Sequence, residues 1–373
     1  NGAFDTFYES LVFSDSWFGP MGSTDKKYQV LSGLAQNISL DPSFWNINAS
    51  SARVTNAYGL LRSPWNVAPM TGLIRANVTY GYYTQYRSAP RCAEFYMAMN
   101  FSDVTTFMKY AQANAHGAIH TIIGGVSNSD WKKFFLDLNF TFGESVGLQG
   151  FGFTKRAWRS GIMDCPSGCS ADTPVSECVC HCPKLDSWNE TDANTILNNI
   201  AGAFDKSTWY VEGRYIGLEF LKLICGRYPE YAAPFLGDAM NSGATADPSF
   251  YPTHPNVDRL FQHRRLFGMT GEDTWPYSNG SKPWFYWGGG NSTFCWGHQP
   301  QSTMIWRRIF VDDQESDHYY TNTEMWEKMD PDKNFNRYVY DNFKWDHCAK
   351  ENYPSNLVFD GTIVDDDGSA WGR

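Results

Sequence analysis

The chain has 373 residues, of which 42% are hydrophobic and 19% charged, a composition that allows a substantial core and argues against global disorder. Its formal net charge of −10, with no run of Lys or Arg, argues against nucleic acid as a partner, because phosphate backbones require a basic face. The longest helix-like apolar stretch, Tyr215 to Cys225, is too short to cross a bilayer, so we expect no membrane span.

The first half of the chain predicts loops, then a helix, then strands. Residues 1–100 are rich in Gly, Pro, Asn and aromatic residues and read as long ordered loops. A helix is expected over Phe101 to Ile123, capped by Ser102 or Asp103 and ending at Gly124-Gly125. Residues 126–164 mix aromatic runs with glycine, which favours strands.

Two helices are expected after the cysteine-rich stretch. The first covers Asn189 to Ala203 and is opened by Asp192, and the second covers Tyr210 to Tyr228 and is closed near Gly226.

A further helix start lies at Asp247-Pro248, where Asp accepts hydrogen bonds from free amides and Pro fits the first turn. Pro252 and Pro255 interrupt this pattern, so a new helix should begin around His254-Pro255. From residue 270 onward we expect irregular structure that ends in a mobile acidic tail.

Asn-X-Ser/Thr sequons indicate the cellular compartment. One sequon arises easily by chance, but eight along one chain predict the secretory route. The localisation expected is therefore extracellular, or the lumen of the secretory pathway. The first residues, Asn1-Gly2-Ala3-Phe4, carry neither an initiator Met nor a leader, as expected of a mature or trimmed product. The predicted glycosylation sites are Asn37, Asn48, Asn77, Asn100, Asn139, Asn189, Asn279 and Asn291.

Nine cysteines are present, five of them between Cys165 and Cys182. Thiolates and the nearby His181 could form a zinc or copper(I) site. In an oxidising compartment the same residues form a disulfide-stapled loop, which is the interpretation that the sequons favour. The odd count leaves one thiol unpaired or bonded to another chain.

The sequence His116-Gly-Ala-Ile-His120 places two imidazoles four residues apart, on one face of a helix and one turn from each other. Such a pair can converge on one metal ion. Far downstream stands Asp247-Pro-Ser-Phe-Tyr-Pro-Thr-His254-Pro-Asn-Val-Asp-Arg-Leu260. With these two segments the chain resembles the tyrosinase, catechol oxidase and molluscan haemocyanin family of type 3 copper proteins.

In that family the second copper is bound by a His-X-X-X-His helix ending near Gly-Gly, and by one His from an Asp-Pro-X-Phe…His-X-Asn-X-Asp-Arg-Leu helix. The resemblance implies that His116, His120 and His254 bind one copper. Two weaker similarities are Leu60–Asn66 with Leu73-Ile-Arg75, and Tyr338-Val-Tyr340, which is similar to the family's closing tyrosine motif. Asn256, Asp258 and Arg259 are expected around the ligands, with a salt bridge that holds the helix as the more ordinary role for Asp258 and Arg259.

Only the second-copper half of the family pattern is visible. The family's first copper takes three histidines from preceding helices, and this chain has no His before position 116. A second copper would need ligands from an N-terminal fragment or a partner chain. Gly117 stands where the family usually has Asn, and Thr253 where it commonly has His, which argues against hydroxylation of phenols and leaves oxidation of diphenols open.

The resemblance implies a mainly α fold with long irregular loops and some β, built on a helix-bundle core of the tyrosinase type whose first-copper helices are not in this chain. The expected division is a partial core over residues 1–345, interrupted by an insertion at 126–246 with the cysteine-rich loop 165–182. A C-terminal tail over residues 346–373 follows.

Two functions remain open at this point. One is a secreted copper oxidoreductase that oxidises phenols or o-diphenols with dioxygen, such as a catechol oxidase. The other is a non-catalytic extracellular glycoprotein with a structural or assembly role on a degenerate scaffold of the same type. An enzyme would take dioxygen and a small phenolic substrate as its partners.

Overall fold

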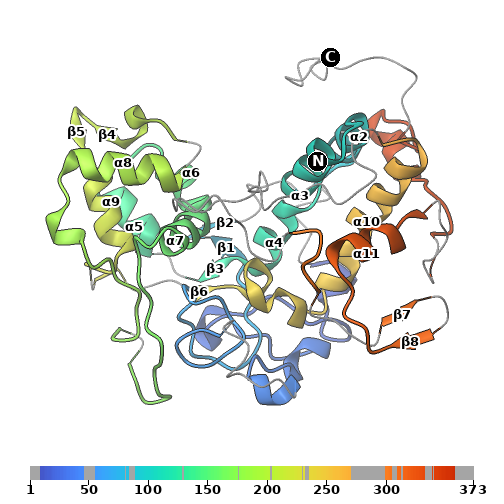
Figure 1. Ribbon diagram of the computed structural model, residues 1–373. Coiled ribbons are helices and arrows are strands. Elements are labelled where there is room, and N and C mark those ends of the chain that lie inside the picture. Colours follow the sequence, from blue (N-terminus) through green and yellow to red (C-terminus); the bar gives the residue numbers. More distant parts are fainter. Residues whose placement is uncertain are drawn as a thin grey trace. The chain divides into compact units, whose positions relative to one another are not determined.

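The computed structural model describes residues 9–45, 55–79, 81–83, 89–127, 130–174, 176–201, 204–228, 230–231, 235–269, 299–304, 309–311, 314–331, 338 and 340–357. These residues form a mainly helical structure with long loops and short strands, as expected (Figure 1). The helices are α2 (Cys92–Asn100), α3 (Val104–Ala113), α4 (Gly117–Gly124), α5 (Asp130–Asp137), α6 (Gly143–Leu148), α7 (Gly150–Arg159), α8 (Glu190–Ala201), α9 (Gly217–Ile224), α10 (Phe250–Leu266) and α11 (Asn322–Lys328).

The strands are all short and form one four-stranded sheet, in the order β2-β1-β3-β6, and two separate two-stranded sheets. They are β1 (Val78–Thr79), β2 (Tyr82–Tyr83), β3 (Val126–Ser127), β4 (Tyr210–Val211), β5 (Arg214–Tyr215), β6 (Phe235–Leu236), β7 (Ile309–Val311) and β8 (Gln314–Ser316). In the central sheet β1 and β3 pair in parallel, and β3 pairs antiparallel with β6.

The chain divides into two compact units. The first contains residues 1–88 and 119–252, and the second contains residues 89–118 and most of the chain from residue 253 onward. The domain boundaries expected from the sequence stay a prediction, and the acidic tail lies outside the described residues.

In the first unit, the described residues up to 79 form loops with short 3-10 turns and no α-helix, as expected, but the expected loop is wrong over residues 92–100, which form α2. The spacing of Cys92, Phe95 and Met99 places their buried side chains on one face of that helix.

Two arginines from the loops before residue 79 are completely buried and paired. Arg62 Nε lies 2.7 Å from Asp238 Oδ1, and Arg75 Nη2 lies 2.6 Å from Asp247 Oδ1. Salt bridges therefore tie these loops to the segment before α10.

The expected strands over residues 126–164 are wrong: apart from β3, the described residues form helices α5, α6 and α7. The reason is the spacing of Trp131, Phe134 and Phe135, which puts all three buried rings on one helical face. Burial of this face outweighs the strand preference of aromatic residues.

An aromatic cluster forms the core of the first unit. Trp209 and Phe220 stack with ring centroids 5.0 Å apart, and Phe153 meets Phe220 edge-on at 5.3 Å. Helices α5, α7, α8 and α9 all contribute buried side chains to this cluster, and Figure 1 shows them gathered together.

The helix expected over Asn189–Ala203 is confirmed as α8, although its opening residue differs. The side chain of Asn189 accepts hydrogen bonds from the amides of Thr191 and Asp192, and Asp192 in turn accepts from the Asn189 amide. Asn189 is thus the cap and Asp192 its reciprocal partner, in the manner of a capping box.

The helix expected over Tyr210–Tyr228 is wrong in its first part. Strands β4 and β5 form a hairpin whose turn places Glu212 and Gly213 at positive φ. Helix α9 starts only at Gly217. Its predicted end is confirmed, because Gly226 takes a positive φ of 70° there.

Disulfides, not a metal, hold the cysteine-rich loop. The pairs are Cys165–Cys180, Cys169–Cys178 and Cys182–Cys225, and a fourth bond, Cys92–Cys348, spans 256 positions in the second unit. The odd cysteine, Cys295, lies outside the described residues. Eight paired cysteines fit an oxidising compartment.

The helix expected over Phe101–Ile123 is broken into α3 and α4 by a turn at residues 114–116. Its predicted cap is confirmed, because the Asp103 carboxylate accepts from the amides of Thr105 and Thr106. At the break, a Cβ on Gly117 would lie 2.9 Å from the Gln112 carbonyl oxygen. The turn is therefore tight, and His116 precedes α4 instead of lying inside one long helix.

Helix α10 starts earlier than expected and runs through Pro255 without a break. The Asp247 carboxylate accepts from the amide and hydroxyl of Ser249, so it caps this helix as the sequence indicated. Pro252 lies in the first turn, where no amide donor is needed. Among the described residues no helix is long and apolar enough to cross a membrane.

In the second unit, His263 on α10 is 3% exposed and its ring stacks on Phe343. Its Nε2 atom lies 2.8 Å from the Asn356 carbonyl oxygen. Burial lowers the pKa of His263, and the nearby Arg259 and Arg264 lower it further, against the opposing effect of the Asn356 carbonyl.

This shift predicts a pH dependence of stability. Because His263 has a lower pKa when folded than its value of about 6.5 when unfolded, the unfolded state binds more protons in this range. The free energy of unfolding should therefore fall as the pH drops below about 6.5. Denaturant titrations at pH 7.5 and 5.5 measure this, and His263→Gln should reduce the difference between them. An equal pH slope in both proteins would contradict the assignment.

Candidate metal centre

Three histidines meet at one place, as the sequence predicted. One ring nitrogen from each of His116, His120 and His254 lies within 4.8 Å of the other two, and all three residues are partly buried. Nitrogens bound at about 2.0–2.1 Å to one ion lie at most about 4 Å apart. The arrangement is therefore close to that of a three-imidazole metal site.

His116 and His120 are brought together by local structure. His116 is the last residue before α4, and His120 follows one turn later. His116 Nδ1 lies 3.2 Å from the Gln112 carbonyl oxygen, and His120 Nδ1 contacts the Ala239 carbonyl oxygen. A carbonyl accepts only from N–H, so both contacts put the ring proton on Nδ1 and the lone pair on Nε2.

His254 comes from the first turns of α10. Its ring meets that of His116 edge-on, with centroids 4.7 Å apart and planes at 72°. The start of α10 is fixed by Asp247, which binds Ser249 on one side and the Arg75 guanidinium through both carboxylate oxygens on the other. Arg75 is completely buried, so this end of the helix has little freedom.

The electrostatics of His120 suit a metal ligand. Burial lowers the pKa of His120, while the Ala239 carbonyl and the Asp247 carboxylate raise it by less. The ring is therefore neutral at physiological pH, which is the form that binds metals. A donor set of three imidazoles fits copper or zinc.

Asp258 and Arg259 contact the C-terminal segment of the second unit. The Asp258 carboxylate accepts from the hydroxyls of Tyr338 and Tyr340, at 2.9 and 2.7 Å. Burial raises the pKa of both tyrosines, and the Asp258 carboxylate raises it further. Tyr340 also donates to the Pro255 carbonyl oxygen. The tyrosine motif is thus joined to the first half of α10.

Arg259 donates to the Asn342 carbonyl oxygen and lies over the Trp345 ring at 4.3 Å. Asp258 and Arg259 thus hold α10 through hydrogen bonds and a cation–π contact, where a salt bridge was expected. Asn256 is half-buried on the same helix, and its expected role near the metal stays a prediction.

The buried pairs Arg62–Asp238 and Arg75–Asp247 are the part of the site that sequence reasoning missed. Their arginines lie in the two segments already noted as similar to the copper family, Leu60–Asn66 and Leu73-Ile-Arg75, and Asp247 lies in the helix-start motif. The only signal in the sequence was a single arginine directly after two apolar residues in each segment, Leu60-Leu61 and Leu73-Ile74.

Other histidines in the described residues take no part in the cluster. His318 pairs with Glu324 at 3.1 Å, and His181 forms a backbone bridge with Asp164. One further group has ligand atoms close enough together to hold a metal ion, namely Cys92, His347 and Cys348. Its two cysteines form a disulfide, however, and offer no thiolate. His298 lies outside the described residues.

The cluster predicts a sharp effect of one substitution. His254→Ala should lower bound copper(II) to background, because two imidazoles alone hold the ion weakly, and should leave the fold nearly intact. His318→Ala is the matched control, since it removes an exposed imidazole outside the cluster. Copper content after dialysis measures both. Equal copper in the two variants would disprove the ligand assignment.

No family model, no curated protein and no solved structure matches this chain. The likeness to the type 3 copper family therefore rests on the motif residues and on where the three histidines lie. At this point the described structure is a mainly helical, disulfide-bonded chain with a three-histidine cluster that could hold a metal ion.

Proposed function

We propose that this chain carries one copper site of a secreted oxidoreductase that uses dioxygen to oxidise phenols or o-diphenols. The observation that carries the proposal is the convergence of His116, His120 and His254, with two of the rings held in the tautomer that presents Nε2. Copper is preferred over zinc because imidazole sites generally bind Cu²⁺ more tightly, and because the motifs resemble those of copper proteins.

When bound, a pair of coppers supplies the redox chemistry that lets dioxygen oxidise a phenolic ring. The chain's own residues hold three imidazoles in place and limit the access of water through partial burial. Phe250 lies edge-on to His120, with ring centroids 6.3 Å apart, and offers an aromatic surface beside the cluster. A flat phenolic ring is the kind of substrate that such a surface favours.

The second copper would take its ligands from elsewhere. No histidine precedes residue 116, and among the described residues the only other metal-like group is the disulfide-bonded one. We therefore propose that the complete enzyme includes three further histidines, on a preceding segment or on a partner chain. The helix-bundle core of the tyrosinase type, with residues 126–246 as an insertion in it, belongs to the same proposal.

A second candidate function is a non-catalytic extracellular glycoprotein. Four disulfides and eight sequons support a stable secreted product, whether or not it binds copper. On this hypothesis the histidine cluster is a remnant. Copper stoichiometry and activity separate the two functions.

One experiment tests the oxidase. The chain alone should bind one copper, and the chain joined to its missing histidines should bind two and consume oxygen with catechol. Metal analysis and an oxygen electrode measure these quantities, with His254→Ala as the inactive control. Failure of the isolated chain to bind copper would end the metal proposal. Two coppers without oxidation of catechol would leave the structural glycoprotein.

The secretory route is supported by the surface position of the sequons. Among the described ones, Asn37, Asn77, Asn139 and Asn189 are exposed. Asn100 is half-buried, and its Oδ1 atom is buried without a hydrogen-bond partner. The exposed four are accessible to a glycosyltransferase, while Asn100 is less so.

Glycan occupancy should follow this difference. In protein secreted by eukaryotic cells, Asn37, Asn77, Asn139 and Asn189 should carry N-glycans and Asn100 should be the least occupied of the five. Peptide mass spectrometry, after enzymatic release in heavy-oxygen water, reads the occupancy of each site. Absence of glycan at all four exposed sites would argue against the secretory route.

A further inference from the structure

We propose that the buried Arg62–Asp238 pair is a positioning device for His120: it fixes the Ala239 carbonyl that holds the proton on Nδ1 and turns Nε2 toward the other two histidines. This inference rests on the proposed metal function. Arg62 and Asp238 contact neither the histidines nor a substrate, so they act as positioning residues.

The first step is the contact itself. His120 Nδ1 meets a carbonyl oxygen 119 positions further along the chain, in the short 3-10 helix Asp238–Met240. Ala239 is buried, and a second apolar cluster joins it to Phe13 and Ile123. The orientation of the His120 ring therefore depends on how firmly this one carbonyl is held.

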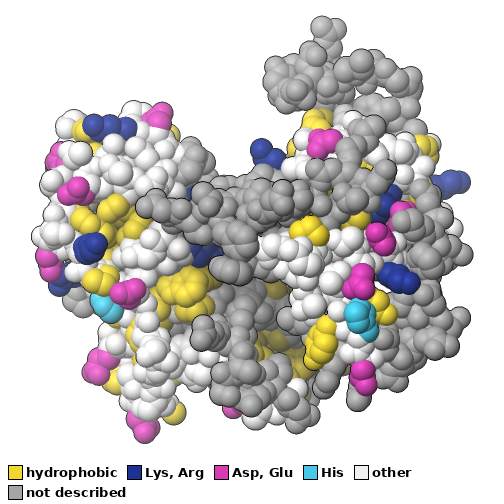
Figure 2. All heavy atoms as spheres, viewed as in Figure 1, with side chains coloured by type: hydrophobic (Ala, Val, Ile, Leu, Met, Phe, Trp, Pro, Cys, Tyr) yellow, Lys and Arg dark blue, Asp and Glu magenta, His cyan; other side chains and the backbone are white. Residues whose placement is uncertain are grey.

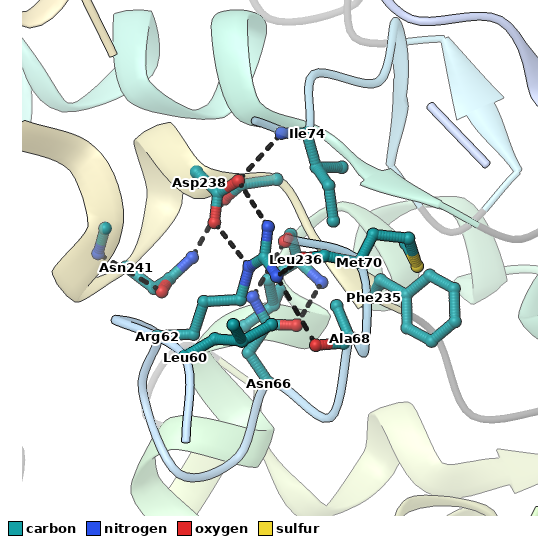
Figure 3. Close-up of polar contacts among 12 residues, drawn as sticks. Leu60, Arg62, Asn66, Ala68, Met70, Ile74, Phe235, Leu236, Asp238 and Asn241 are labelled. Atoms are coloured by element: carbon teal, nitrogen blue, oxygen red, sulfur yellow. Dashed lines mark hydrogen bonds and ion pairs between the residues drawn. The ribbon is translucent and has the colours of Figure 1, made fainter. Parts of the chain in front are cut away.

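The second step is what holds that 3-10 helix. The Asp238 carboxylate accepts from Arg62 Nε at 2.7 Å and Nη2 at 2.9 Å, and from the Ile74 amide at 2.7 Å (Figure 3). Both charged side chains are completely buried. Ala239 follows Asp238 directly, so a shift of this carboxylate would carry the carbonyl with it.

Arg62 is itself immobilised. Besides Asp238, its guanidinium donates to the carbonyl oxygens of Ala68, Met70 and Gly72 (Figure 3 shows the first two). All three nitrogens of the Arg62 guanidinium thus donate hydrogen bonds. Such a fork fixes both distance and orientation, which a hydrophobic contact or a single-point lysine would not do.

The third step is the close approach of α4 to the segment that carries Ala239. The Gly237 amide donates to the Gly125 carbonyl oxygen at 2.9 Å, next to the β3–β6 ladder. A Cβ on Gly237 would lie 1.8 Å from the Gly124 carbonyl oxygen. Only glycine permits this approach, which places the end of α4 beside the 3-10 helix.

The energetics of burial favour a positioning role over a merely stabilising one. A buried ion pair costs desolvation energy, and apolar residues of the same volume often stabilise a fold as well or better. Its advantage is directional: each donor has one acceptor and one geometry. The pair lies at the residue adjacent to the carbonyl that orients His120, where direction matters.

The test uses Asp238→Asn, which keeps the shape of the side chain but leaves the Arg62 charge without a counter-ion. Asp330→Asn is the control, because it breaks another Arg–Asp pair, Arg265–Asp330 at 3.0 Å, which is largely buried (12% and 15% exposed) and lies in the second unit, away from Ala239. Both variants and the parent chain are first compared by circular dichroism and thermal unfolding.

Two readouts are then taken. In metal-free protein, nitrogen NMR of the imidazole rings should show His120 with its proton on Nδ1 in the parent and in Asp330→Asn, and a mixture of tautomers in Asp238→Asn. Copper(II) affinity, measured by competition with a chelator, should fall 10–100-fold in Asp238→Asn, as is typical when an outer partner of a metal ligand is lost, and change less than twofold in the control.

A folded Asp238→Asn with the parent's tautomer and affinity would overturn the inference. If that variant does not fold, Arg62→Lys replaces it, since it keeps the charge and should shift the tautomer in the same direction by less. A parent His120 that already populates both tautomers would overturn the inference without any variant. Failure of the parent to bind copper would remove the proposed function but leave the tautomer result to decide the positioning role.

Discussion

Two buried arginine–aspartate pairs hold the irregular first part of this chain to the segment that leads into α10. Arg62 and Arg75 reach partners 176 and 172 positions away, and each is completely shielded from solvent. An unpaired charge in such a place would be very costly, so each pair forms as a unit or not at all. Long loops without α-helix can be well ordered on this basis.

The histidine cluster depends on the same two pairs. One pair adjoins the carbonyl that contacts His120, and the other fixes the cap of the helix that carries His254. The loops that carry Arg62 and Arg75 therefore help to hold the histidines in position. Metal ligands usually need such outer contacts. A histidine ring that rotates freely must lose side-chain entropy when it binds a metal, and it is less well oriented toward the ion.

Much of the local structure could be predicted from the sequence. The Asp103 cap, the Gly226 helix end and the Asp247 cap all follow from short-range hydrogen-bonding preferences. The aromatic run near Trp131 was misjudged as strand, although the i, i+3, i+4 spacing of its large rings was a helical signal. The break between α3 and α4 could not be predicted in this way, because it depends on how closely the start of α4 packs against the turn at residues 114–116.

Sequence reasoning identified the three histidines of the candidate site but not the groups that hold them in place. Three histidines could be grouped because their spacing and neighbours follow a family pattern. The carbonyl of Ala239 could not be identified, because a backbone acceptor leaves no trace in residue types. The same holds for Asp238 as the partner of Arg62, since ion pairing over such a separation follows from the fold. Charges of both signs are interspersed over the described part of the face drawn in Figure 2.

The Cys92–Cys348 bond encloses most of the chain in one covalent loop. In the chain-entropy model, closing a loop of this size raises the free energy of the unfolded state by about 5.5 kcal/mol, because it removes conformational entropy from that state. It also means that a protease cutting a surface loop anywhere between these cysteines produces two fragments that stay attached to each other. A nicked molecule would keep both histidine-bearing helices in one particle, so maturation by cleavage and retention of the cluster are compatible in this architecture.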